Sequence, residues 1–133
     1  MAKRTKSLMP SEKQIHISVC EYLRLRYPDL IFTSDMGGLL VGMGVRMEIK
    51  NKSSHFKIPD LLIFKPNSTC SAAFFELKKS KDDLYLKKCG SLKNDHVKSQ
   101  EHCMMLLRDL GFHAQFTIGF EGTIQAIEKY LNT

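Results

Sequence analysis

Residues 58–78 decide the fold of this chain, and their sequence is IPDLLIFKPNSTCSAAFFELK. The apolar run from Asp60 to Phe64 lies between Pro59 and the turn-forming residues 65–68, a pattern typical of a buried strand that ends in a turn. Residues 72–78 then form a second apolar run. Together the two runs predict a β-hairpin.

Charged side chains interrupt this hairpin where packing alone favours apolar ones. Because side chains alternate along a strand, Glu76 and Lys78 project from one face and Leu77 from the other. If the strands pair, Asp60 comes close to Glu76, and two neighbouring carboxylates persist when a cation compensates their charge. Hard oxygen ligands suit Mg²⁺ or Mn²⁺. The alternative is a surface hairpin in which Glu76 forms an ion pair with Lys78 or Lys79.

The N-terminal half of the chain begins its regular structure at residue 11. Ser11 and Gln14 have the spacing of a capping box, which predicts a helix that starts there and ends before Pro28. Residues 30–33 predict a short strand. Residues 37–57 are glycine-rich and then polar and basic, and they predict a loop with one irregular helix.

The C-terminal half alternates between helix and strand after a lysine-rich surface segment at 79–95. Apolar spacing predicts a helix over 96–110 with Gly111 as its C-cap, a strand over 112–118 and a helix over 121–131. The order of helix, three strands, helix, strand and helix predicts an α/β or α+β protein with a mixed sheet.

Composition limits the classes of protein to which this chain can belong. Its 133 residues are 43% hydrophobic and 26% charged, which suits one soluble domain and excludes a disordered chain. No apolar stretch approaches the roughly 20 residues of a membrane-spanning helix, and the basic start lacks the apolar core of a secretory signal. We expect a basic arm over residues 1–10, one domain over 11–133 and a cytoplasmic location. The net charge of +6 permits a polyanionic partner.

The four cysteines, at positions 20, 70, 89 and 103, form no CxxC pair. Without an export signal we expect reduced thiols rather than a disulfide framework. Cys89, His96, His102 and Cys103 could be placed around zinc, but their spacing matches none of the usual structural zinc patterns. We therefore expect no zinc site.

The ordered set of motifs resembles the PD-(D/E)xK nuclease superfamily and, within it, the VRR-NUC branch. The resemblance covers roughly residues 11–131. Its motifs are Glu12 at the start of the first helix, Ile58-Pro59-Asp60, Phe75-Glu76-Leu77-Lys78, Gln100 in the next helix, Leu110-Gly111-Phe112 and Tyr130-Leu131 in the last helix. It implies an α/β fold with a restriction-endonuclease-like core, a mixed β-sheet flanked by helices.

The resemblance also implies the metal ligands of the site. Asp60 and Glu76 would be the principal ligands of one or two Mg²⁺ or Mn²⁺ ions, with the backbone carbonyl of Leu77 as a third. Glu12 would face the same site from the first helix. An alternative role for Glu12 is to complement the dipole of that helix.

Two further residues have implied roles in catalysis. Lys78 would position the attacking water, and Gln100 would form a hydrogen bond within the site. The alternative for Gln100 is a solvated helix residue. Hydrolysis would leave 5′-phosphate products, as in the superfamily.

Basic residues follow the proposed site closely in sequence. From Lys78 to Lys98, both included, there are seven lysines against three aspartates. Such groups contact phosphates without reading the base sequence, and no base-reading recognition helix is apparent, so we expect recognition of DNA shape. The candidate DNA-binding residues are Lys79, Lys81, Lys87, Lys88, Lys93, Lys98, Lys3 and Arg4.

Small free-standing VRR-NUC proteins are similar to Holliday junction resolvases, and this similarity gives the leading hypothesis for function. It is a metal-dependent, structure-selective DNA endonuclease that resolves branched or four-way junctions. A junction has two symmetric strands to cut, so a homodimer is the natural assembly. We expect a phage-encoded protein in a prokaryotic host. The alternatives are a flap, nick or single-strand nuclease, an inactive nucleic-acid-binding module, and a structural protein with ion-paired carboxylates.

Overall fold

The computed structural model describes residues 9–36, 40–86 and 90–133. Four α-helices, four strands and one short 3₁₀ helix are formed by these residues. In chain order they are α1 (Glu12–Arg26), β1 (Phe32–Ser34), α2 (Met43–Asn51), β2 (Leu61–Ile63), β3 (Ala73–Lys78), η1 (Lys81–Asp83), α3 (Asp95–Asp109), β4 (His113–Ile118) and α4 (Gly119–Leu131).

The strands form one mixed sheet in the order β1-β2-β3-β4. The pairs β1–β2 and β2–β3 are antiparallel, whereas β3 and β4 are parallel and are connected through α3. Asn67 closes the β2–β3 hairpin, because its side-chain oxygen accepts hydrogen bonds from the backbone amides of Thr69 and Cys70. The predicted hairpin and mixed sheet are both confirmed.

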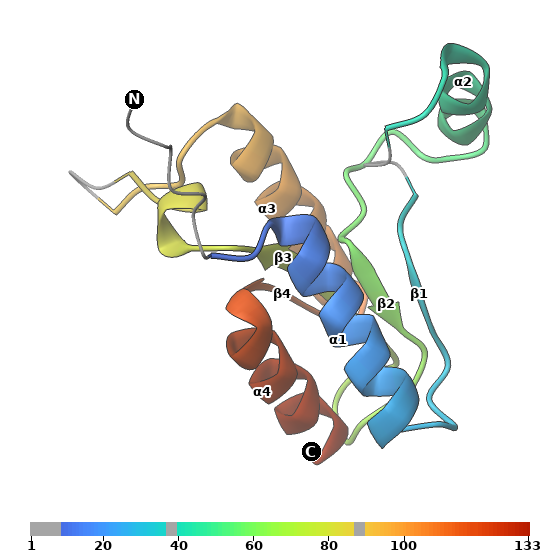
Figure 1. Ribbon diagram of the computed structural model, residues 1–133, viewed down its shortest axis with the longest axis vertical. Helices are drawn as coiled ribbons and strands as arrows, with labels where there is room; N and C mark the ends of the chain where they lie inside the picture. Colours follow the sequence, from blue (N-terminus) through green and yellow to red (C-terminus); the bar gives the residue numbers. More distant parts are fainter. Residues whose placement is uncertain (1–8, 37–39, 87–89) are drawn as a thin grey trace, which may run out of the picture.

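Helices cover both faces of the sheet (Figure 1). One face of β3 carries Ala73, Phe75 and Leu77, which form the hydrophobic core with α1 and α4. The other face carries Glu76, which contacts Gln100 of α3. The two-residue period of the strand thus separates an apolar layer from the layer that holds the charged side chains.

The first helix begins as its sequence predicts. The Ser11 side chain accepts a hydrogen bond from the Gln14 backbone, and the Gln14 side chain accepts one from the Ser11 backbone. This reciprocal pair satisfies amides that have no partner within the helix. The cap fixes the entry of the chain into α1 and, with it, the position of Glu12, the first residue of the helix.

Two segments differ in detail from the sequence-based expectation. The irregular helix expected within 37–57 is a regular nine-residue helix, α2, which buries no residue and projects from the body of the molecule (Figure 1). The expected surface segment at 79–95 is not entirely superficial, because Leu84 is buried and Tyr85 pairs with Leu92 in an isolated bridge. Burial of Leu84 therefore holds part of this lysine-rich segment against the rest of the domain.

Three cysteines lie in the described part of the chain, and Cys20, Cys70 and Cys103 are all free thiols. Cys89 lies outside the described residues. Of the helices that the structure describes, none is both long and apolar enough to span a bilayer.

Candidate active site

Three carboxylates from three different elements converge at one end of the sheet. Glu12 is the first residue of α1, Asp60 directly precedes β2, and Glu76 lies within β3. One carboxylate oxygen from each lies within 4.8 Å of the other two. Among the acidic, histidine and cysteine side chains of the described residues, these three carboxylates form the cluster with the geometry to hold a metal ion.

Backbone hydrogen bonds hold two of these carboxylates against each other. In the β2–β3 register Leu61 faces Phe75, which brings the preceding Asp60 beside Glu76. The Asp60 backbone amide donates a hydrogen bond of 3.1 Å to Oε2 of Glu76, and the Leu77 amide donates one of 2.9 Å to Oδ2 of Asp60. The hairpin itself therefore orients both acids.

Burial of Glu76 is the main electrostatic feature of the site. The residue is only 4% exposed, and burial, followed by the negative charge of Asp60, raises its pKa to about 9. Lys78 lowers the pKa of Glu76, but its ammonium lies 3.8 Å from Oε1, beyond hydrogen-bonding distance, and does not outweigh burial. Burial also raises the pKa of Glu12. In the absence of another cation, the site therefore favours the protonated form of Glu76.

Glu76 and Lys78 form a buried ion pair. The sequence had left open a surface ion pair as the alternative. Lys78 is 6% exposed, close to the value for Glu76. A surface ion pair gains little and needs no such enclosure. Burial of a carboxylate and a lysine costs solvation free energy, and such costs are typical of functional sites.

Gln100 connects α3 to the centre of the site. Its Nε2 donates a hydrogen bond of 2.7 Å to Oε1 of Glu76 and lies 3.2 Å from Nε2 of His96. Its Oε1 is buried and has no hydrogen-bond partner among the described residues. Gln100 is itself 7% exposed, so the alternative of a solvated helix residue does not describe its position.

The donor set fits a hard divalent cation. Carboxylate oxygens are the ligands that Mg²⁺ and Mn²⁺ prefer, and a cation would relieve the desolvated, mutually repelling charges of Glu12, Asp60 and Glu76. The structure records the Leu77 amide bonded to Asp60, whereas ligation by the Leu77 carbonyl stays a prediction. His96 and Cys103, considered above for zinc, are not in the metal-compatible group.

Comparison with known proteins gives a match at the level of the fold. No protein-family model and no curated protein sequence matches this chain. A solved structure described as "VRR_NUC domain protein" is similar over 92% of this chain and 89% of its own length, with a TM-score of 0.64 and 15% sequence identity. This chain has the fold of a VRR_NUC domain. The expected restriction-endonuclease-like core, a mixed sheet flanked by helices, is confirmed.

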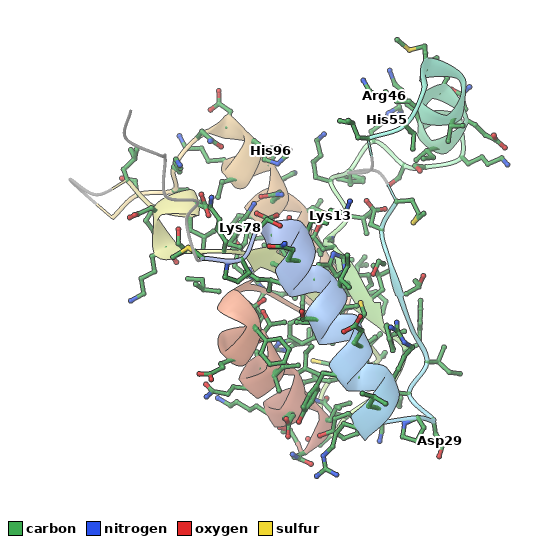
Figure 2. All side chains as sticks on the ribbon, viewed as in Figure 1. Lys13, Asp29, Arg46, His55, Lys78 and His96 are labelled. Atoms are coloured by element: carbon green, nitrogen blue, oxygen red, sulfur yellow. The ribbon has the colours of Figure 1, made fainter. Side chains whose placement is uncertain are left out.

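The three carboxylates of this VRR_NUC fold line a cleft of about 550 Å³. Lys78 and Gln100 line it too, so the cleft brings together the five residues for which the resemblance implies catalytic roles. Figure 2 shows Lys78 and His96 near the start of α1, and Arg46 and His55 across from them on the side of α2.

Sequence reasoning missed the second wall of this cleft. The wall comes from α2 and the loop after it, and its polar members are Arg46, Lys50, Ser53, Ser54, His55 and Lys57. The spacing of Arg46 and Lys50, four residues apart in a segment of positive charge, was the available signal, because such residues share one face of a helix. Likewise, His96 lies four residues before Gln100 on α3.

The predicted DNA-binding lysines that the structure describes are exposed. Lys79 and Lys81 follow β3 directly, and Lys93 and Lys98 lie around the start of α3. None of these four is among the residues that line the cleft, although each lies within three residues of Lys78 or His96, which do. Lys3, Arg4, Lys87 and Lys88 lie outside the described residues.

Proposed function

We propose that this protein is a member of the VRR-NUC family and a metal-dependent nuclease that hydrolyses phosphodiester bonds in DNA. The observation that carries the proposal is the convergence of Glu12, Asp60 and Glu76 within 4.8 Å on the fold of a VRR_NUC domain. Hydrolysis of a phosphodiester needs an activated water and compensation of developing negative charge. Carboxylates that can hold a cation beside a lysine meet both needs.

Each side chain of the site has a task in this hydrolysis. Asp60, Glu76 and Glu12 hold one or two Mg²⁺ or Mn²⁺ ions, which supply water activation and charge neutralisation when bound. Lys78 lines the cleft and positions the attacking water while its ammonium stabilises charge on the phosphate. Gln100 orients the Glu76 carboxylate through its 2.7 Å hydrogen bond. The products carry 5′-phosphates.

The proposed substrate is a four-way junction or another branched DNA. The exposed lysines beside the cleft support binding to phosphates without a sequence preference. Cutting the two symmetric strands of a junction requires two sites, and we therefore propose a homodimer with one site in each subunit.

Cleavage of defined DNA structures tests this function. Purified protein is incubated with labelled four-way junction, flap, nicked duplex, duplex and single-stranded DNA in Mg²⁺, Mn²⁺ or EDTA. The variants are Asp60→Asn and Glu76→Gln, with the exposed Asp29→Asn, at the opposite end of α1, as the matched control. We expect cleavage that needs metal, is lost in both site variants and persists in the control. Cleavage that survives either site variant contradicts the assignment.

The pattern of products separates the remaining candidates. Paired symmetric nicks in the junction alone support a resolvase, whereas cutting of flaps, nicks or single strands alone favours the other nuclease types. Binding without cleavage in every metal favours an inactive module. A free protein with the mass of the 15.2 kDa monomer, together with only one protein copy bound per junction, contradicts the homodimer.

A further inference from the structure

The segment from Gly42 to Lys57, called here the α2 arm, is not held in place by burial. Helix α2 contains no buried residue, although burial of an apolar face normally stabilises helices of this length. The arm projects away from the sheet and from the other helices (Figure 1). Its inner side nevertheless lines the same cleft as Asp60 and Glu76. A costly extension of this kind, placed over a catalytic cleft, points to a role in contacting the ligand.

The charge of the α2 arm suits a polyanion. The arm has four basic residues against a single acidic one, Glu48. Glu48 is neutralised by Lys52, which lies 2.7 Å away on the outer part of the helix. Arg46, Lys50 and Lys57 line the cleft, and the acidic Asp35 lines it too. Three cations of the arm therefore line the same cleft as the carboxylates of Glu12, Asp60 and Glu76.

Phe56 adds an aromatic ring to this basic wall. Its side chain is 51% exposed, and it lines the cleft between His55 and Lys57. Single exposed apolar residues are common on protein surfaces, so Phe56 is distinguished by its place in the lining of the cleft. A basic groove that contains an exposed aromatic ring is the arrangement that binds single-stranded nucleic acid, because unpaired bases offer a π-face for stacking. In a continuous duplex these faces are covered by neighbouring bases.

We propose that the α2 arm binds an unpaired DNA strand at a branch point and presents it to the site. Phe56 stacks on a base that has left the duplex, and Arg46, Lys50 and Lys57 bind the phosphates on either side of it. This inference rests on the proposed nuclease function and adds the substrate feature that the site selects. It predicts a preference for DNA with unpaired nucleotides at a junction or flap over continuous duplex.

Binding measurements in EDTA test the stacking contact without any need for cleavage. The probe is a flap or four-way junction with 2-aminopurine at the branch point, compared with the same base inside a duplex. We expect the wild-type protein to bind branched DNA more tightly and to quench 2-aminopurine fluorescence. Phe56→Leu should weaken binding to branched DNA about tenfold, in the range measured for base–aromatic stacking, and abolish the quenching, with duplex binding unchanged.

The chain offers a matched control for this substitution. Phe64 is also 51% exposed but does not line the cleft. Phe64→Leu should leave binding and quenching unchanged, and circular dichroism should show that both variants are folded. Equal effects of the two substitutions, no effect of Phe56→Leu, or no preference of the wild type for branched DNA would each overturn the proposal.

Salt dependence tests the binding of phosphates separately. The triple variant Arg46→Gln, Lys50→Gln, Lys57→Gln should weaken binding to the branched probe. It should also reduce the slope of log K against log salt by about 0.7 for each single-strand phosphate that the variant no longer neutralises. The control is Lys129→Gln, an exposed lysine in the last turn of α4. An unchanged slope in the triple variant overturns this part of the proposal.

The two proposals fail in different ways. If the wild type binds and quenches through Phe56 but cleaves no DNA with any metal, the nuclease proposal fails and the strand-binding surface stands. If it cleaves in a metal-dependent way but Phe56→Leu binds normally, the nuclease stands and the role of the α2 arm is wrong.

Discussion

Gln100 on α3 donates a hydrogen bond of 2.7 Å through Nε2 to Oε1 of Glu76 on β3, and this bond joins the helix to the carboxylate cluster. Both residues are buried, at 7% and 4% exposure. Glu76 also accepts a bond from the Asp60 amide, so both of its carboxylate oxygens have donors. Such double anchoring leaves the carboxyl group little freedom and prepares it to bind a cation in one orientation.

Removal of this anchor should weaken metal binding. Gln100→Leu keeps the approximate volume of the side chain and deletes its donor, so we expect the Mn²⁺ dissociation constant to rise about 10- to 100-fold, the usual effect of removing a partner of a metal ligand. Isothermal titration calorimetry measures it, with Gln125→Leu on the exposed side of α4 as the control. An unchanged dissociation constant would falsify a positioning role for Gln100.

The stability of the metal-free protein should depend on the ionisation of Glu76. Its pKa is raised from 4.5 to about 9, first by burial and then by the charge of Asp60. Because the pKa of Glu76 is higher in the folded than in the unfolded state, its contribution to stability is fully present below pH 4.5. This contribution is lost as the pH rises toward 9. Glu76→Gln cannot ionise, so in EDTA at about pH 8 it should need more urea to unfold than the wild type, with a smaller difference at about pH 5.

The matched control for this titration is Glu21→Gln, an exposed glutamate on α1, which should change the urea midpoint little at either pH. Metal binding gives a second measurement on the same proteins. Because Mn²⁺ must displace a proton from the site, the rise in Tm on adding Mn²⁺ should be larger at about pH 8.5 than at about pH 6. Glu76→Gln should lose most of this rise, and a full metal response in that variant contradicts the assigned ligand.

Lys78 should affect cleavage far more than binding. Its side chain is 6% exposed and lies beside Glu76 within the cleft. Lys78→Met keeps the aliphatic stem and removes the ammonium, and we expect single-turnover cleavage to fall about 10²- to 10³-fold, as for loss of other groups that stabilise transition-state charge. Affinity for the DNA measured in EDTA should change little. The exposed Lys79→Met serves as the comparison, and it should lower affinity without slowing single-turnover cleavage at saturating protein.

The capping box of α1 should couple helix stability to the site. Ser11→Ala removes the side-chain acceptor for the Gln14 amide and should cost about 1 kcal/mol in the free energy of unfolding, measured with urea. Because the next residue is Glu12, loosening of this turn should also weaken Mn²⁺ binding. Ser11→Asp retains a good cap and should restore the stability. Loss of stability with no change in Mn²⁺ affinity would show that Glu12 does not need the cap.

Much of the fold could be predicted because its signals are local. The capping residues set the start of α1. Gly111 ends α3 with a φ of 95°, a conformation that glycine adopts without steric cost. The apolar runs on either side of residues 65–71 pair as a hairpin. Helix ends shifted by one or two residues, as expected where fraying and caps compete. The α2 arm could not be predicted with the same clarity, because α2 has no buried face to leave a periodic pattern.

The sequence by itself determined which residues of β3 share a face, and hence that Glu76 and Lys78 lie together, because the two-residue period of a strand is a property of the backbone. The pairing of a hairpin also placed Asp60 beside Glu76. Only the tertiary structure decided that Glu12 and Gln100 reach the same point, since this depends on how α1 and α3 pack against the sheet. It also decided that Glu76 and Lys78 are buried and that the α2 arm forms the other side of the cleft. Burial and the juxtaposition of distant segments arise from packing, which no local pattern encodes.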